Sequence, residues 1–381
     1  MGQNIRAKFL NSSYAGSELE KINFDRSYIS HAVKKNTYKT IKIYNLRPQE
    51  ASILKQTAIG LGFDACVNRG VLDCSVEYSD AILTGSEVQF EKLAKALSPQ
   101  PFKMNQVAEG ISSLFNSKVK PIEINGIKFD WKRPYIMGIL NITPDSFSDG
   151  GKYNTVDTAL KRYIQMIDEG ADIIDIGAES TRPSHEKITP EEEIKRLSPI
   201  LKELRNADKN IPISVDTRNV KTAETAIELG ANIINDVGFY GLNCDMVDFV
   251  NTNSVPYVLM HNQKIEKSVV DEVFWWFEDS LAKITAPVII DVGIGFGKTI
   301  DENYELISRM KEFKSFHLPL LVGHSRKSFL SRTFNLKDDE LDEATLAISC
   351  GLITDKVDIL RVHNVKKHKI VLDVLGKLAE K

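Results

Sequence analysis

The sequence predicts an α/β protein, in which a (β/α)8 TIM barrel is preceded by a small α/β N-terminal domain. Two observations support this prediction. Short runs rich in Val and Ile alternate with helical patterns from residue 134 onward, and near-continuous apolar runs are typical of parallel strands buried on both faces. Eight such runs fall within about 250 residues, the usual length of a (β/α)8 barrel. An open, doubly wound sheet is the structural alternative.

The predicted barrel strands are short and regularly spaced. They cover residues 134–140, 172–180, 212–217, 232–237, 256–261, 287–293, 319–325 and 357–364. The segment between the first two strands shows a helical pattern, because its apolar side chains within residues 156–171 fall on one face. Gly170 and Gly230 stand just before the next strand, where glycine commonly ends a helix. The alternation predicts residues 131–381 as one barrel domain.

Residues 1–130 show a different pattern and are predicted to form the small α/β domain. Two strands and two helices are expected there, at residues 41–46, 80–85, 48–62 and 86–97. Residues 120–131 predict a short hairpin that could cover the bottom of the barrel. Residues 1–35 have a weak pattern, so loose order is expected for them. This part of the sequence contains no catalytic motif.

Composition limits the classes of protein to which the chain can belong. It has 381 residues, 42% hydrophobic and 27% charged, with a net charge of −3 and a pI near 6.2. This balance offers no basic footprint for nucleic acid or an anionic membrane, and no run of about 18 apolar residues predicts a membrane-spanning helix. The first residues lack the apolar core of a signal peptide, and the four cysteines lack CxxC spacing. A cytoplasmic protein with reduced thiols is expected.

Polar side chains stand at the carboxyl end of every predicted barrel strand. The catalytic residues of (β/α)8 barrels lie at these ends, whereas a purely structural barrel would scatter its polar groups. In chain order, the ends carry Asn141, Glu179 to Pro183, Asp216 to Arg218, Asn235 and Asp236, His261 and Asn262, Asp291, Gly323 to Ser328, and Arg361 to Asn364. The pattern predicts an active site at this face of the barrel.

These side chains divide by their chemistry. Cationic donors suit phosphate groups, which barrels often bind near strands seven and eight. The candidate donors are Arg182, Arg326, Lys327, Arg361 and His363. Carboxylates and an amide suit the NH and C=O edges of a flat heterocycle. The candidates for this part are Asp216, Asn235 and Asp291. Asn141 can offer a carbonyl oxygen to a hard cation such as Mg²⁺, which would share the phosphate oxygens.

Each feature also has another interpretation. Asp216 and Asp291 could cap the helices that follow them, and Gly293, Gly295 and Gly297 could form a simple tight turn. The histidines at the strand ends could bind a metal, but the first strand carries no HxH pair, which disfavours a zinc hydrolase. A Schiff-base aldolase is a further alternative, and it requires a lysine on a strand, facing the barrel axis.

Eight stretches of the sequence follow one another in a specific order. They are MGILNITPDSFSDGG, IGAESTRP, ISVDT, NIINDV, VLMH, DVGIGFGKT, GHSRKS and LRVHNV. On these motifs, residues 134–381 resemble the dihydropteroate synthases, a family of folate-pathway enzymes and the target of sulfonamides. The stretch RPQEASILKQTAIGLGFDACVNRG is similar to an N-terminal extension found on some longer members.

The resemblance implies a transferase of folate biosynthesis. Members of the family condense (7,8-dihydropterin-6-yl)methyl diphosphate with 4-aminobenzoate, which yields 7,8-dihydropteroate and diphosphate. Mg²⁺ is the implied cofactor, the two substrates are the implied small-molecule partners, and a homodimer is the implied assembly. Two alternatives are a pterin-binding methyltransferase domain, which would not need the phosphate ligands, and a non-catalytic pterin-binding paralogue. Such a paralogue would have lost one of four ligands, all present here: Asn141, Arg182, Lys327 and Arg361.

The resemblance also implies roles for individual residues, carried over motif by motif. The pterin is expected to contact Asp216, Asn235, Met260, Asp291 and Lys327. The diphosphate is expected to contact Asn141, Arg182, Arg361 and His363. The 4-aminobenzoate pocket is expected to be bordered by Thr181, Pro183, Phe296 and Ser328. The metal ligand is expected to be Asn141, and the catalytic residues are expected to be Lys327, Asp216 and Arg182.

Two stretches bear on how the site would work. Residues 141–154 follow the first strand with many Gly, Ser, Asp and Pro residues and no regular period. They are expected to form a catalytic flap that orders, together with residues 181–189, when the diphosphate binds. The family commonly shows Asp-Pro-Gly-Phe-Gly-Phe-Gly-Lys after the sixth strand, whereas Val292 and Ile294 replace the Pro and the first Phe here. This departure bears on substrate fit more than on activity.

Overall fold

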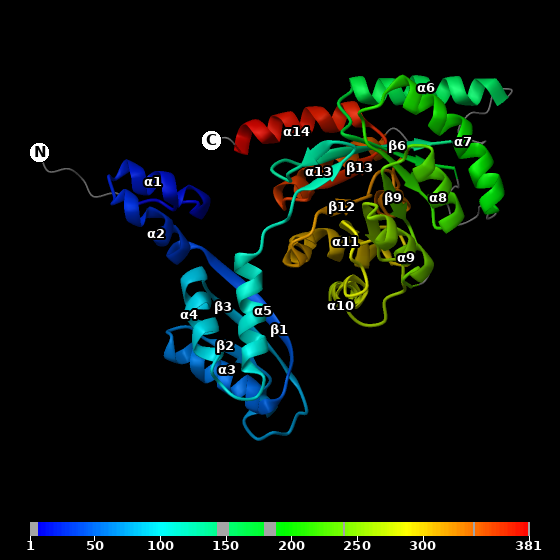
Figure 1. The fold of residues 1–381 in the computed structure, drawn as a ribbon. Helices are drawn as coiled ribbons and strands as arrows, with labels where there is room; N and C mark the ends of the chain where they lie inside the picture. The colour runs from blue at the N-terminus through cyan, green and yellow to red at the C-terminus, as the bar shows by residue number, and fades with distance from the viewer. Residues whose placement is uncertain (1–6, 143–151, 179–187, 239–240, 338–339, 380–381) are drawn as a thin grey trace, which may run out of the picture. The chain divides into compact units, whose positions relative to one another are not determined.

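The computed structural model describes residues 7–142, 152–178, 188–238, 241–337 and 340–379. The chain forms two compact units, Met1–Lys118 and Val119–Lys381, which Figure 1 shows in blue to cyan and in cyan to red. Each unit has its own buried apolar core. The division falls before the 120–131 hairpin, because this hairpin packs on the barrel, whereas the sequence pattern predicts the boundary after it.

The first unit contains a three-stranded antiparallel sheet, in the order β1-β3-β2. Its core joins the sheet to side chains of the three helices that follow the first strand. The elements of this unit are η1 (Ser12–Tyr14), α1 (Ala15–Lys21), η2 (Arg26–Tyr28), α2 (Ile29–Asn36), β1 (Tyr38–Leu46), α3 (Pro48–Gly60), β2 (Ala65–Val67), η3 (Arg69–Val71), β3 (Ser79–Ser86), α4 (Glu87–Leu97) and α5 (Met104–Asn116).

The expectation of loose order near the N-terminus is wrong for the part that contains α1 and α2. A helix of eight residues is marginal by itself, so local sequence alone gives little signal for α2. The structure supplies a tertiary contact instead, because Lys34 of α2 lies 2.6 Å from Glu91 of α4. The predicted strands and helices between residues 41 and 97 are confirmed.

The second unit is a closed barrel of eight parallel strands surrounded by helices (Figure 1). Every strand coincides with a predicted run, although β6 extends one residue beyond its run, and the (β/α)8 prediction is confirmed. The strands are β6 (Tyr135–Asn141), β7 (Ile173–Gly177), β8 (Ile213–Asp216), β9 (Ile233–Asp236), β10 (Tyr257–Met260), β11 (Val288–Asp291), β12 (Leu320–Val322) and β13 (Ile359–Val362). Nearly all of their residues are buried, which explains why each reads as a continuous apolar run.

Helices cover the outside of the barrel, and the main core lies between them and the strands. They are α6 (Lys152–Asp168), α7 (Pro190–Ala207), α8 (Val220–Glu228), α9 (Cys244–Asn253), α10 (Val269–Leu281), α11 (Ile300–Ser308), η5 (Met310–Phe316), α12 (Ser328–Phe334), α13 (Glu340–Thr354) and α14 (Val365–Ala379). Thr299 and Glu302 form a capping box that begins α11 directly after the glycine-rich loop. The start of α11 therefore fixes one end of that loop.

A hairpin closes the lower, amino-terminal end of the barrel. Its strands are β4 (Ile122–Ile124) and β5 (Ile127–Phe129), joined by Asn125 and Gly126, both with positive φ, as a tight two-residue turn requires. The apolar side chains of the hairpin pack against inward-facing residues from seven of the eight barrel strands. The predicted covering role of residues 120–131 is confirmed. The barrel therefore has an apolar floor and a polar mouth.

Candidate active site

Four neighbouring strands, β6 to β9, bring polar residues into register at the mouth of the barrel. Asn141 pairs with Gly177, Gly177 with Asp216, and Asp216 with Asn235. A Cβ atom on Gly177 would lie 3.6 Å from the Asp216 Cβ and 3.7 Å from the Asn141 Oδ1. The absence of a side chain at Gly177 therefore leaves Asn141 and Asp216 facing a shared space.

The guanidinium of Arg361 joins two carboxylates next to these residues. Arg361 of β13 donates from Nε to Asp175 at 2.6 Å and from Nη2 to Asp216 at 2.8 Å. The Asn235 amide donates to the same Asp175 oxygen at 3.1 Å. All four side chains are buried or nearly so, and buried charges require this kind of pairing. The network fixes the orientation of Asp216 and Asn235, two of the five residues expected to contact the pterin.

The surroundings of Asp216 in this network place its pKa near neutral pH. Burial raises the pKa of Asp216 to about 7, with Asp175 and Glu193 adding to the effect and Arg361 and Lys327 opposing it. Burial also raises the pKa of Asp291, although its carboxylate accepts a hydrogen bond of 2.8 Å from the Gly293 N–H. Perturbed carboxyl groups that gather in one cavity mouth are typical of functional sites.

Lys327 lies beyond β12, at the residue before α12, and is not on a strand. Its Nζ stands 3.9 Å from the centroid of the Phe296 ring, a cation–π contact. Burial and Arg361 lower the pKa of Lys327 to about 8, against the opposing effect of Asp291 and Asp216. A Schiff-base aldolase would need this lysine on a strand, so the placement argues against that alternative.

The glycine-rich loop after β11 approaches its neighbours too closely for other residues. Gly293 has a φ of +70°, and a Cβ there would lie 1.9 Å from the His261 carbonyl oxygen. Gly295 has a φ of +82°, and a Cβ there would lie 3.0 Å from the Lys327 Cδ. Glycine is required at both positions, both for the backbone conformation and for space. The loop therefore does more than reverse the chain, because its close packing against Lys327 positions that side chain.

A buried lysine holds the glycine-rich loop from inside. The Lys298 Nζ lies 3.0 to 3.2 Å from four acceptors, which are the Nδ1 and carbonyl oxygen of His261 and the carbonyl oxygens of Gly293 and Phe296. Burial lowers the pKa of Lys298 to about 7, and burial beside Lys298 lowers that of His261 to about 3. His261 is therefore neutral, and the Lys298 ammonium is used to brace the loop.

His363 and Arg326 differ from the expected pair of cationic donors. Burial, together with Arg326 and Arg361, lowers the pKa of His363 to about 3, so the imidazole is neutral at physiological pH. The expectation of a positive charge on His363 is wrong, because three cations already surround its ring. Arg326 forms a bidentate pair with Asp342 of α13, at 2.7 and 3.1 Å. Its guanidinium is thus engaged on the helical side of the loop.

The remaining predicted site residues are partly described. Met260 is buried at the end of β10, in register with Asp291. Ser328 is exposed at the first residue of α12. Thr181, Arg182 and Pro183, and most of the predicted flaps at 141–154 and 181–189, lie outside the described residues.

The structure adds three residues that the sequence patterns did not single out. Asp175 lies inside the apolar run DIIDIG, where a charged residue in mid-strand could have signalled a buried pair. Lys298 follows the third glycine of the loop, and Ser325 precedes the Arg-Lys pair. No pattern in the sequence indicates that Lys298 contacts His261 or that Ser325 contacts His363, because these histidines follow or end other strands.

The donor set near Asn141 suits a shared cation and not a resident one. Among the described residues, no three His, Cys, Asp or Glu side chains gather to hold a metal ion. Asn141 is exposed at the end of β6 and offers one amide oxygen. Mg²⁺ usually keeps several waters and takes one or two protein oxygens together with substrate phosphates. The residues present fit that arrangement.

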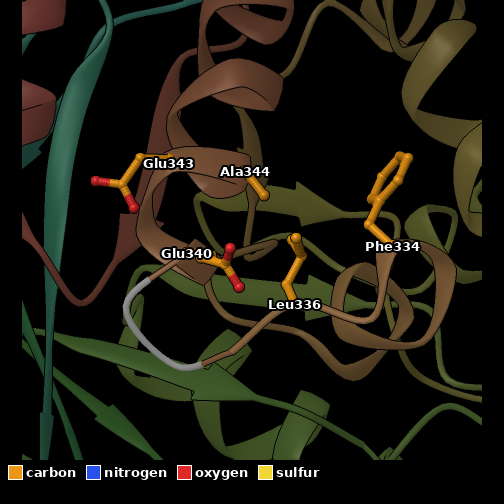
Figure 2. Close-up of a pocket in the computed structure, with 5 residues that line it drawn as sticks. All are labelled: Phe334, Leu336, Glu340, Glu343 and Ala344. Atoms are coloured by element: carbon orange, nitrogen blue, oxygen red, sulfur yellow. The ribbon is translucent and has the colours of Figure 1, made fainter.

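A pocket lies between the end of α12 and the first turns of α13 (Figure 2). It is lined by Phe334, Leu336, Glu340, Glu343 and Ala344. Both of its carboxylates have partners, because Glu340 accepts from the Lys337 N–H at 2.8 Å and Glu343 pairs with Lys367 at 2.6 Å. None of these residues belongs to the predicted site.

Two further observations concern the class of protein. Within the described ranges, no helix combines the length and apolar character needed to cross a membrane. All four cysteines are free, as expected from their spacing.

The fold and the polar mouth of the barrel are those of a (β/α)8 barrel enzyme, and comparison with known proteins agrees. A family model described as pterin binding enzyme matches residues 137–363. A dihydropteroate synthase from Clostridium beijerinckii is 44% identical over 243 residues, which cover 61% of this chain and 90% of the relative. A crystal structure of dihydropteroate synthase from Clostridium difficile, obtained with pteroic acid, matches with a TM-score of 0.62 and 37% identity. The match covers 66% of this chain and 98% of that one.

The chain therefore belongs to the pterin-binding enzymes and, within them, to the dihydropteroate synthases. It is accordingly a transferase of folate biosynthesis. The similarity also reaches beyond the barrel. A probable bifunctional folylpolyglutamate synthase/dihydropteroate synthase from Halobacterium salinarum is 33% identical over 350 residues, 88% of this chain. These residues cover 42% of that relative, so the first unit has a counterpart there while more than half of the relative has none here.

Proposed function

We propose that the mouth of the barrel condenses (7,8-dihydropterin-6-yl)methyl diphosphate with 4-aminobenzoate, by the following division of roles. The observation that carries this proposal is the network in which Arg361 joins Asp175 and Asp216 beside Asn235, with Lys327 and the glycine-rich loop next to it. This network presents carboxylate oxygens and an amide in fixed positions, while a cation and an aromatic ring stand at the edge. Such a site matches a flat donor-rich ring better than a flexible substrate.

The pterin ring is assigned to the buried part of the site. Asp216 accepts hydrogen bonds from the ring N–H groups, and Asn235 can both donate and accept. Asp291 and Lys327 complete the polar edge, and Met260 offers an apolar contact. The pKa of Asp216 near 7 supports this role, because a ring that donates hydrogen bonds or gains positive charge would favour the ionised carboxylate.

The diphosphate is assigned to Asn141, Arg182, Arg361 and His363. Arg361 donates hydrogen bonds to two carboxylates in this structure. We therefore give it a second role, in which it orients Asp216 and Asp175 for the pterin. His363 is neutral, so it would contribute an N–H donor and not a charge. Mg²⁺, bound by Asn141 together with the phosphate oxygens, would neutralise charge on the leaving group.

The 4-aminobenzoate is assigned to the outer part of the site, near Phe296 and Ser328, with Thr181 and Pro183 on the other side. Phe296 presents a half-buried ring, and Ser328 is exposed at the start of α12. The helix start offers N–H groups that suit a carboxylate. This arrangement places the second substrate nearer the solvent than the first.

The reaction breaks the bond between the pterin methylene carbon and the ester oxygen that links it to the diphosphate. It forms a bond from that carbon to the 4-aminobenzoate nitrogen. Diphosphate leaves with the electron pair, and the amine loses one proton. Diphosphate is a good leaving group and the dihydropterin ring is electron-rich, so early C–O cleavage is favoured. Asp216 would stabilise the positive charge that develops on the ring, and Lys327 and the diphosphate ligands would stabilise the departing anion.

The test is a pyrophosphate-release assay with dihydropterin diphosphate, with and without 4-aminobenzoate. Release is expected only when both substrates and Mg²⁺ are present. Lys327→Ala should lower the rate about 10²–10³-fold, because it removes one preorganised cationic donor, while the unfolding transition stays close to that of the parent. Lys337→Ala is the matched control, since Lys337 lies outside the assigned site. A Lys327→Ala enzyme of near-full activity would contradict the assignment.

Three expectations from the sequence, a magnesium ion shared with the substrate, a homodimer and a cytoplasmic location, remain predictions. Calorimetry should show weak Mg²⁺ binding to the empty protein and tight binding only with pyrophosphate or the pterin substrate. Tight binding to the empty protein would contradict a shared cation. A homodimer and a cytoplasmic location are likewise proposed.

A further inference from the structure

The Ser325 hydroxyl connects the loop after β12 with the end of β13. Ser325 is buried, and its Oγ lies 3.2 Å from the His363 backbone nitrogen and 3.0 Å from the His363 Nδ1. The backbone N–H can only donate, so it occupies one lone pair of the hydroxyl oxygen. The direction of the second hydrogen bond decides which ring nitrogen of His363 carries the proton.

Two arrangements are chemically possible, and the burial of Ser325 separates them. If the hydroxyl donates to Nδ1, the Ser325 hydroxyl proton and the His363 Nδ1 both have partners, and the proton of His363 resides on Nε2. If Nδ1–H donates to the hydroxyl instead, the Ser325 proton needs another acceptor. Among the described residues, Ser325 Oγ has no hydrogen-bond partner besides these two groups of His363. A buried hydroxyl proton without an acceptor is disfavoured, so the first arrangement holds.

The surroundings of His363 make this choice important for an anionic ligand. Arg326, Arg361 and Lys327 lie near the ring, and protonation of the ring would add a fourth positive charge. A neutral imidazole attracts an anion only through an N–H group, while the other ring nitrogen presents a lone pair that repels it. Within the described residues, the His363 Nε2 has no hydrogen-bond partner of its own, so it is available to a ligand.

We propose that Ser325 is a positioning residue that holds His363 in the Nε2–H tautomer, so that His363 donates a hydrogen bond to the anionic end of the substrate. The tautomer follows from the hydrogen-bond geometry alone. The identity of the anion rests on the proposed function, in which His363 contacts the diphosphate.

The tautomer can be measured directly in the full-length protein. Long-range ¹H–¹⁵N spectra of the chain labelled with ¹⁵N-histidine separate Nε2–H from Nδ1–H rings, and the His363→Gln variant identifies the His363 signal among the seven histidines. The expected result is an Nε2–H ring for His363 between pH 6 and 8. An Nδ1–H ring, or a doubly protonated ring, would overturn the proposal without any reference to activity.

Ser325→Ala tests the positioning role. It should give a mixture of both tautomers and raise the Kd for Mg²⁺-pyrophosphate about tenfold, as expected for the loss of one hydrogen bond to a charged ligand. Ser325→Thr keeps the hydroxyl and should keep the tautomer. Ser349→Ala is the matched control, because Ser349 is also a buried serine bonded to histidines, His324 and His368. It should leave the His363 signal and pyrophosphate binding unchanged.

A double variant separates a tautomer effect from a general loss of structure. Gln at position 363 carries a fixed amide donor and has no tautomers, so Ser325→Ala should not weaken pyrophosphate binding further in the His363→Gln background. An equal loss in both backgrounds would overturn the positioning role. If pyrophosphate leaves the His363 Nε2 signal unmoved while the tautomer is as expected, the diphosphate role of His363 under the proposed function fails, and the hydrogen-bond assignment of Ser325 is retained.

Discussion

The pKa of Asp216 lies at about 7 and that of Lys327 at about 8, and both residues are expected to contact the pterin. Burial raises the pKa of Asp216 to about 7, so the carboxylate is ionised above that pH and protonated below it. Burial lowers the pKa of Lys327 to about 8, so the ammonium is charged below that pH and neutral above it. The active combination, a carboxylate with an ammonium, is most populated between the two values.

We therefore predict a narrow bell-shaped pH profile for kcat/KM of the pterin substrate, with an acid limb near pH 7 and a basic limb near pH 8. Steady-state rates from pH 5.5 to 9.5 at constant ionic strength would measure it. Asp216→Asn should lower the activity and remove the acid limb, and Lys327→Arg should move the basic limb upward. A profile that stays flat from pH 6 to 9 is incompatible with these assignments.

At the residue scale, the sequence could predict which side chains reach the mouth of the barrel, but not how they pair. Asp216, Asn235 and Arg361 stand at strand ends, so their placement follows from the fold. Their partnership with Asp175 joins β7 to β13 and β9, which lie far apart in the sequence. The neutral state of His363 likewise depends on cations from other elements. Charge states follow from three-dimensional neighbours, which a single sequence does not display.

At the scale of elements, the glycine-rich loop explains why two departures from the family pattern are tolerated. Val292 and Ile294 are fully buried in the main core, and they do not line the mouth of the barrel. Gly293, between them, makes the close approach to His261, and Gly295, directly after Ile294, makes the one to Lys327. The residues that differ are thus packing residues, and the residues that shape the site are retained. The substitution of two apolar side chains by two others is compatible with substrate binding.

Gly295→Ala should separate the seating of Lys327 from overall stability. The new Cβ would combine a positive φ with a 3.0 Å approach to the Lys327 Cδ. We expect a destabilisation of about 1–3 kcal/mol and a fall in kcat/KM of roughly 10²-fold, because a small displacement of a catalytic group is costly. Gly351→Ala is the control, since a Cβ there meets open space on α13. It should leave the activity unchanged; equal activity of both variants would contradict the role of Gly295.

The hairpin β4–β5 should affect stability without affecting the site. Phe129 is buried against the apolar floor of the barrel. Phe129→Ala is expected to lower the free energy of unfolding by about 3–5 kcal/mol, with little change in the KM of either substrate, because the floor lies at the opposite end from the mouth. Ile127→Ala, on the same hairpin but 39% exposed, should change stability by less than about 1 kcal/mol. Denaturant unfolding at 25 °C would compare them.

At the scale of the whole molecule, the two units have separate cores. The buried residues of the first core lie between residues 41 and 111, and those of the barrel between residues 122 and 365. The architecture was predictable because strands buried on both faces produce continuous apolar runs, and eight of them in succession suit few folds. The helices α1 and α2 were not, because both are short and together bury only Ala15, so they give little apolar signal in the sequence.

Deletion of residues 1–118 is predicted to leave a folded barrel that binds the pterin substrate. Every residue assigned to the site follows Met137, and the C. difficile structure shows that a chain of barrel length occurs by itself in the family. Calorimetric titration with the pterin substrate should give a Kd within about threefold of the full chain. A deletion at residue 131, which also removes the hairpin, is the contrasting variant and should be much less stable. An insoluble 119–381 protein would show that the barrel depends on the first unit.

The apolar floor of the barrel affects how substrates enter the active site and how products leave it. Among the described residues, the hairpin and the inward apolar side chains pack together at the lower end, so substrates and products are expected to pass through the mouth of the barrel. In the proposed arrangement, the pterin lies deepest, next to Asp216 and Asn235, and 4-aminobenzoate lies nearer the entrance, at Phe296 and Ser328. A 4-aminobenzoate molecule that arrives first would stand in the path of the pterin. The single entrance, and not any affinity of one substrate for the other, would then determine the order in which the substrates bind.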